Sequence, residues 1–148
     1  SDMSPVTAVI PAADVPGVCF PIDSMRGITF VSAHPKSPMR GCKEWSAGII
    51  GLGELATTQK QGDITVVLGD LNSGTDHPSF RKLLNSGFKD AALCEAKGRH
   101  ATFPSWLPWP RIILDHVLFT KGLYASDVSS FCVEGSDHLA LVATLTLK

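Results

Sequence analysis

The stretch ITVVLGDLN, residues 64–72, carries the pattern that decides the fold. Its first five residues are rich in β-branched side chains and predict a buried strand, which Gly69 ends before Asp70 and Asn72. These two polar residues stand two apart at a strand end, so their side chains can point the same way. A carboxylate and an amide placed there can orient a water, hold a phosphate oxygen or support Mg²⁺. An ordinary Asp/Asn turn that ends a strand is an equal alternative.

Three other apolar runs have a histidine or an aspartate at one end. Residues 28–33 are followed by His34, and residues 112–114 are followed by Asp115 and His116. The third run, residues 139–147, is preceded by the GSDH sequence at 135–138. Strand ends beside loops are where a rigid sheet can hold polar groups at the rim of a cleft. A carboxylate at Asp115 inside an apolar strand needs a partner, and His138 would remove the cost of burying it. His138 could serve as a general base, although a simple loop histidine at a solvated strand start is the favoured interpretation of that motif alone. His116 faces the other side of a regular strand and is interpreted as structural.

Length and composition indicate one globular domain. The chain has 148 residues, 44% of them hydrophobic, which is enough for a buried core. Its net charge of −1 argues against a broad basic surface for nucleic acid, but a locally bound phosphate ester stays compatible with it. The longest apolar runs are strand-sized, well short of the ~18 residues of a membrane span. Residues 1–3 are interpreted as an expression-tag remnant, ahead of a domain that covers residues 4–148.

Hydrophobic periodicity predicts a strand-rich chain with two helices. Extended segments are expected near residues 6–10, 18–22, 28–33, 64–68, 111–119, 127–133 and 139–147. One helix is expected at about 43–60, where apolar residues share a stripe. The second should begin at Pro78, capped by Thr75 or Asp76, and end at Gly87. This pattern is typical of one sheet that is covered on one face by helices.

The four cysteines are widely spaced and form no CxxC pair, so a zinc site built from them is not expected: Cys19, Cys42, Cys94 and Cys132. Their even number permits disulfides, but buried apolar thiols are the favoured interpretation. The redox compartment stays open.

Taken in order, the motifs resemble those of the endonuclease/exonuclease/phosphatase superfamily of DNase I-like enzymes. The ordered set is His34, GDLN at 69–72, LDHV at 114–117 and GSDH at 135–138. Two further phrases, DHP at 76–78 and TFP at 102–104, are similar to those of actinobacterial membrane-associated members. The resemblance covers about residues 28–147.

The resemblance implies an α/β fold that is half of a four-layer α/β/β/α sandwich. The half would contain one mostly antiparallel or mixed sheet with two main helices on one face. Family members normally run to about twice this length, and their first half supplies an Asn and the Glu that is the principal metal ligand. Neither is matched here, so we expect the carboxy-terminal half of such a domain, inactive by itself. Localisation stays open, with a membrane-anchored parent that has an extracytoplasmic domain as one alternative.

For phosphate and metal binding, the resemblance implies roles for four residues. Asp70 would lie against the scissile phosphate and the metal-bound water, and Asn72 would hydrogen-bond a phosphate oxygen. His34 would bind the phosphate and assist the leaving group. Asp137 would contribute to metal binding alongside Asp70, directly or through water. The implied cofactor is Mg²⁺ or Mn²⁺, which neutralises phosphoryl charge while a water attacks in line.

For proton transfer, the resemblance implies that His138 is the general base or a phosphate-stabilising histidine, with Asp115 as its carboxylate partner. The expected partners are a phosphate-ester substrate (nucleic acid, lipid head group or sugar phosphate) and the missing amino-terminal half-domain. The fragment is also expected to self-associate through its bare sheet face. A binding or scaffolding module that keeps the fold without turnover is the alternative function. A zinc hydrolase is disfavoured because the sequence has no HxxxH or HxH pair.

Overall fold

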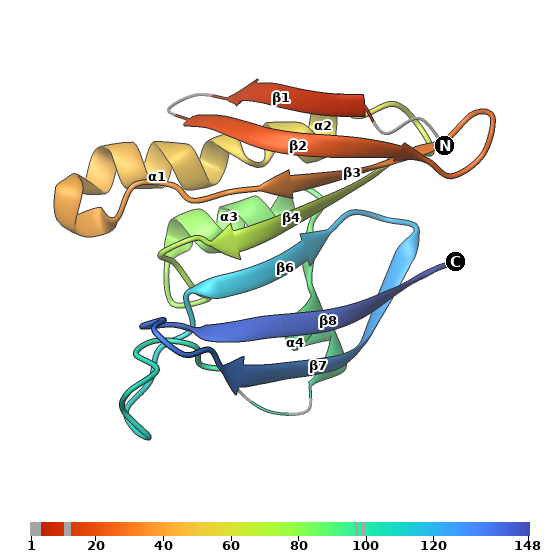
Figure 1. The fold of residues 1–148 in the computed structure, drawn as a ribbon. Coiled ribbons are helices and arrows are strands. Elements are labelled where there is room, and N and C mark those ends of the chain that lie inside the picture. The colour runs from red at the N-terminus through yellow and green to blue at the C-terminus, as the bar shows by residue number, and fades with distance from the viewer. Residues whose placement is uncertain (1–3, 11–12, 97, 99) are drawn as a thin grey trace.

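The structure, a computed structural model, describes residues 4–10, 13–96, 98 and 100–148, and its side chains from residue 15 onward. The expected tag remnant at residues 1–3 lies outside the described residues. The elements follow one another as drawn in Figure 1: β1 (Ser4–Ile10), β2 (Ala13–Pro21), β3 (Gly27–Ser32), a 3-10 turn η1 (Pro38–Arg40), α1 (Cys42–Gly51), α2 (Glu54–Thr58), β4 (Ile64–Asp70), α3 (Pro78–Asn85), β5 (Lys89–Asp90), α4 (Ala91–Glu95), β6 (Asp115–Phe119), β7 (Leu123–Cys132) and β8 (Leu139–Leu147).

Six strands form one mixed sheet in the order β1-β2-β3-β4-β6-β5. Strands β3 and β4 pair in parallel, because α1 and α2 carry the chain back to the start of the sheet between them. The other neighbours in this sheet pair antiparallel. β7 and β8 form a separate two-stranded antiparallel sheet. The expected α/β class with a mixed sheet and a few helices is confirmed.

Two hydrophobic clusters lie on the two faces of the mixed sheet. Because successive strand residues face opposite sides, Val67 of β4 packs with α1 and α3, whereas Ile64 and Val66 belong to the other cluster. That second cluster receives side chains from β6, β7, β8 and α4. Residues 64–67 are therefore buried from both sides, as their run of β-branched residues predicts.

Several predicted boundaries differ from the structure. The helix expected at 43–60 is divided into α1 and α2 at Gly53. An added Cβ there would lie 2.8 Å from Ser86 Oγ, so this glycine permits the turn between the two helices to pack closely on the C-terminal end of α3. The strand expected from residue 111 begins at Asp115. Helix α3 starts at Pro78 as predicted, but its N-cap is His77, whose side chain makes no capping hydrogen bond. Helix α4 was not predicted.

The interpretation of the cysteines as buried thiols is wrong for three of them. Cys42, Cys94 and Cys132 are exposed and Cys19 is half-buried; all four are free. Cys42 is the first residue of α1 and Cys132 is the last residue of β7, positions where the chain turns at the surface.

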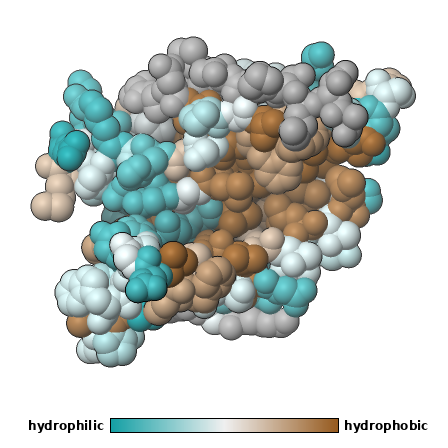
Figure 2. Space-filling model, viewed as in Figure 1, coloured by the Kyte–Doolittle hydropathy of each residue, from teal (hydrophilic) through white to brown (hydrophobic). Residues whose placement is uncertain are grey.

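Hydrophobic side chains are partly exposed on the face of the sheet that lies opposite α1 and α3, beyond the part that α4, β7 and β8 cover. Figure 2 shows this patch across the middle of the molecule. Strands β1 and β2 extend the sheet at its edge and do not cover the patch. Among the described residues, no helix is long and apolar enough to span a membrane.

Candidate active site

The ends of β3 and β4 are held unusually close together. The Ala33 amide donates to the Leu68 carbonyl at 2.9 Å, and a Cβ on Gly69 would lie 2.0 Å from the Ala33 carbonyl oxygen. Gly69 also has a φ of +144°, which L side chains rarely adopt. Only a glycine fits between the two strands here, and the contact brings His34 beside Asp70.

The next strand brings a second carboxylate to the same edge. Asp70 and Asp115 are direct partners in the antiparallel register of β4 and β6. Like charges opposite each other across a sheet repel, so this pair needs a compensating positive group. A positive charge at this edge of the sheet would therefore relieve the repulsion between the two carboxylates.

Asp70 ends its strand in a turn and still keeps one oxygen for the site. Its Oδ1 accepts from the Asn72 amide at 2.8 Å, so the GDLN motif contains an Asp/Asn turn, which leaves its functional role a prediction. Asn72 has a φ of 48°, and its side-chain amide donates to the Pro35 carbonyl at 3.4 Å. Asp70 Oδ2 faces two histidines instead, with His34 Nε2 at 3.6 Å and His138 Nε2 at 3.9 Å.

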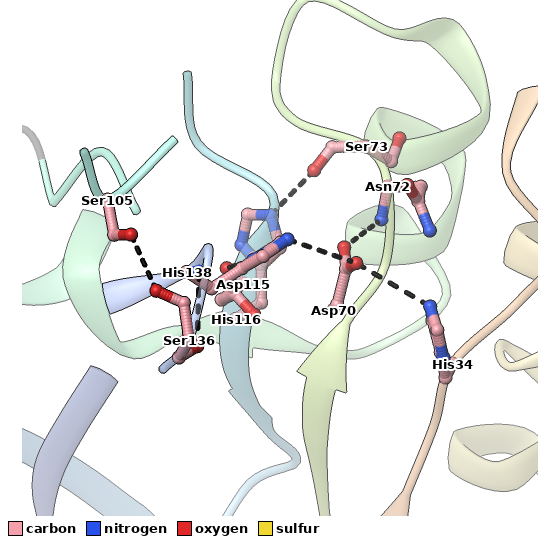
Figure 3. Close-up of polar contacts among 9 residues, drawn as sticks. All are labelled: His34, Asp70, Asn72, Ser73, Ser105, Asp115, His116, Ser136 and His138. Carbon is pink, nitrogen blue, oxygen red and sulfur yellow. Dashed lines mark hydrogen bonds and ion pairs between the residues drawn. The ribbon is translucent and has the colours of Figure 1, made fainter. Parts of the chain in front are cut away.

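His138 lies between the two carboxylates, as Figure 3 shows. Its Nδ1 is 2.8 Å from Asp115 Oδ2. Because a carboxylate accepts at Nδ1, neutral His138 carries its proton there and presents the Nε2 lone pair toward Asp70. Asp70, Asp115 and His138 are each about one fifth exposed, so the group opens to solvent without being freely hydrated.

The net effect of the surroundings is a raised pKa for His138. Desolvation by burial, the largest influence, lowers that pKa, but the hydrogen bond and charge of Asp115 and the charges of Asp70 and Asp137 together outweigh it. The two opposed carboxylates thus favour the protonated form of His138 relative to a free imidazole.

Loop contacts that the sequence did not predict hold His138 in place. The His138 amide donates to Ser136 Oγ at 3.1 Å, and Ser105 Oγ donates to the Ser136 carbonyl at 2.7 Å. The Phe103 ring lies against the imidazole with centroids 4.8 Å apart. Phe103 and Ser105 come from a loop about 35 residues earlier, and their own sequence context gave no signal for this role.

The structure brings the predicted residues together at one edge. Asp115 is within hydrogen-bonding reach of His138, and Asp70, Asn72 and His34 lie on the same rim, as expected from their strand-end positions. Their catalytic roles stay predictions.

A complete metal site is not among these contacts. Asp137, the other predicted metal ligand, is exposed. Within the described residues, no group of three or more His, Cys, Asp or Glu side chains could hold a metal ion. Asp70 and Asp137 thus do not form a metal centre with other residues of this part of the chain.

The fold and the paired histidine and carboxylates at the sheet edge are features of a DNase I-like hydrolase. The chain belongs to the endonuclease/exonuclease/phosphatase family, whose family model matches residues 4–138. This family comprises phosphoester hydrolases that generally depend on divalent metals. No curated protein matches the sequence significantly.

Solved structures share the fold at low sequence identity. A humanized D. rerio TDP2 is 14% identical with a TM-score of 0.73, over 97% of this chain and 66% of that one. An endonuclease/exonuclease/phosphatase family protein from Leptotrichia buccalis is 15% identical with a TM-score of 0.69, over 90% and 54%. A mannosyl-6-phosphatase from Bacteroides thetaiotaomicron is 17% identical with a TM-score of 0.64, over 89% and 58%. The chain thus spans between about half and two thirds of these structures.

Proposed function

We propose that this chain carries the proton-transfer and phosphate-binding side of a metal-dependent phosphoesterase centre. The observation that carries the proposal is the alignment of Asp115, His138 and Asp70, with one carboxylate on each side of the imidazole. A carboxylate on Nδ1 fixes the tautomer of a catalytic histidine and stabilises the imidazolium that forms when Nε2 takes a proton. Support for the reaction class comes from membership of the phosphoesterase family.

In the proposed reaction, His138 Nε2 takes a proton from the water that attacks phosphorus. Asp115 keeps Nδ1 protonated and stabilises the charged ring. Asn72 and His34 donate hydrogen bonds to the phosphoryl oxygens, and His34 assists the leaving group. His34 is suited to that contact because its side chain is three-quarters exposed at the rim beside Asp70.

The cofactor we propose is Mg²⁺ or Mn²⁺, with Asp70 and Asp137 contributing and a glutamate from outside this sequence as the principal ligand. This divides the centre between the present chain, as a carboxy-terminal portion, and an amino-terminal half-domain. The substrate class is a phosphate ester. Support comes from fold neighbours described as a mannosyl-6-phosphatase and as D. rerio TDP2 in complex with a single-strand DNA product. The proposal includes that the chain is part of a membrane-anchored protein similar to actinobacterial members of the family.

The chain by itself should hydrolyse a generic diester, bis(p-nitrophenyl) phosphate, at close to the background rate. Mg²⁺ held by only one or two carboxylates keeps most of its waters and leaves readily. Joining the chain to a glutamate-bearing half-domain should restore turnover in the presence of Mg²⁺ or Mn²⁺. Robust turnover by the 148-residue chain that Asp70→Ala abolishes would contradict the division of the centre, and an inactive joined protein would favour a scaffolding role.

The partner we propose for the chain when it is alone is a second copy of itself. Its apolar sheet face is open, and at ~25 cal/mol per Å² the burial of several hundred Å² favours association after entropy losses. A two-fold dimer would cover this face with the same face of another chain. Light scattering should show a mass that rises with protein concentration, whereas a strict monomer at high concentration would contradict self-association.

A further inference from the structure

A second histidine and aspartate are paired beneath the active-site edge, on the helical side of β6. His116 Nδ1 lies 2.6 Å from Asp90 Oδ2, and both side chains are only 3% exposed. The His116 ring packs on Phe80 with centroids 4.3 Å apart. Neither residue reaches the rim where Asp70 and His138 meet, so the proposed reaction does not use them directly.

The other nitrogen of His116 connects this pair to the active-site turn. His116 Nε2 lies 2.7 Å from the Ser73 carbonyl oxygen (Figure 3). A carbonyl can only accept, so Nε2 carries a proton and donates it. Asp90 Oδ2 fixes the ring from the other side, while its Oδ1 accepts from the Ala92 amide and caps α4.

The turn that receives this hydrogen bond is held by its surroundings. Asn72, one residue before Ser73, has a left-handed φ of 48°, a conformation that asparagine adopts more readily than most residues. Ser73 is fully buried, and its Oγ has no hydrogen-bond partner among the described residues. The Leu71 amide donates to the Leu114 carbonyl at 2.9 Å, which fixes the other end of the turn.

We propose that His116 and Asp90 are positioning residues, which hold the backbone of residues 71–74 and thereby aim the Asn72 amide and the Asp70 carboxylate into the site. The buried contact between His116 and Asp90 need not stabilise the fold, because proteins in which apolar residues replace a buried ion pair are often as stable. The directional bond to Ser73 accounts for a histidine here. The assignment rests on the proposed function for its catalytic meaning, but the positioning itself is testable without activity.

The test compares His116→Asn with His116→Gln in the full 148-residue chain by amide hydrogen exchange. Asparagine can donate to Asp90 but is too short to reach the Ser73 carbonyl, whereas the glutamine amide reaches about as far as Nε2. We expect His116→Asn to speed exchange at the Leu71 and Asn72 amides about tenfold, the effect of leaving a buried carbonyl unpaired. His116→Gln should stay within about threefold of the unsubstituted chain at both amides.

Amides of residues 66–68 in β4 report opening of the sheet as a whole and serve as the internal reference. Equal acceleration there and at Asn72, or no difference between the two variants, would overturn the positioning role.

The unsubstituted chain offers a check that needs no variant. A slowly exchanging proton on His116 Nε2 is expected in ¹⁵N spectra, and an unprotonated Nε2 would overturn the contact. None of these results depends on turnover, so failure of the proposed function, which the diester assay detects, is a separate outcome.

Discussion

His138→Ala and Asp70→Ala should each lower kcat by a factor of ~10² or more in the phosphoesterase that contains this chain and the glutamate-bearing half-domain. Loss of His138 removes the group that takes the proton from water and leaves Asp70 and Asp115 opposed without the imidazole between them. Loss of Asp70 removes the carboxylate that both His34 and His138 face. The measurement is steady-state hydrolysis of bis(p-nitrophenyl) phosphate.

Asp76→Ala is the matched control for Asp70→Ala, because Asp76 is an exposed carboxylate in the same connection between β4 and α3. It should leave kcat within about twofold, as surface changes away from the site usually do. Near-unchanged rates for both site variants would show that the motif assignment is wrong.

The pH dependence of the same reaction adds an independent readout. A general base acts when deprotonated, so the rate should rise as pH increases through the pKa of His138. That pKa is raised above the ordinary histidine value of 6.5, which places the half-maximal rate above pH 6.5. Asp115→Asn removes two of the influences that raise the pKa and should move this midpoint to lower pH. A rate that falls as pH rises through the same range would instead assign His138 as a phosphate-stabilising cation.

A residue of this centre could be predicted from the sequence only where its neighbours in the chain determine its position in the fold. Asp70 and Asn72 follow a strand whose apolar run is unambiguous, so their place at a sheet edge was predictable from periodicity. Asp115 was predictable because a carboxylate in an apolar strand needs a partner, and only a few histidines could supply one. His138 itself was ambiguous until its contact with Asp115 was known.

The residues that escaped prediction act through long-range contacts. Asp90 caps helix α4, which was not predicted, through its hydrogen bond from the Ala92 amide. Nothing local to Asp90 indicates that its second oxygen binds His116, 26 residues later. Ser105 likewise depends on a partner 31 residues away. Sequence periodicity describes which face a residue occupies, but only the fold determines what it meets there.

Gly69→Ala should lower the free energy of unfolding by at least ~2 kcal/mol and displace Asp70 from His138. The new methyl group would lie 2.0 Å from the Ala33 carbonyl oxygen, which belongs to the backbone and cannot rotate away as a side chain can. Either β3 and β4 must separate at this end, or the strand must turn before Asp70. Both responses alter the part of β4 that the active site uses.

Gly62→Ala separates this clash from the general penalty of a positive φ. Gly62 stands at the other end of the same strand with a φ of +92°, and its added Cβ would meet only the flexible Arg26 side chain at 3.4 Å. Chemical denaturation should therefore show a loss of only ~1–2 kcal/mol for Gly62→Ala. NMR titration of His138 gives the local readout: the charge of Asp70 contributes to its raised pKa, so that pKa should fall in Gly69→Ala and stay unchanged in Gly62→Ala. Equal losses of stability with an unchanged His138 pKa in both variants would mean that the close approach of β3 and β4 does not set the position of Asp70.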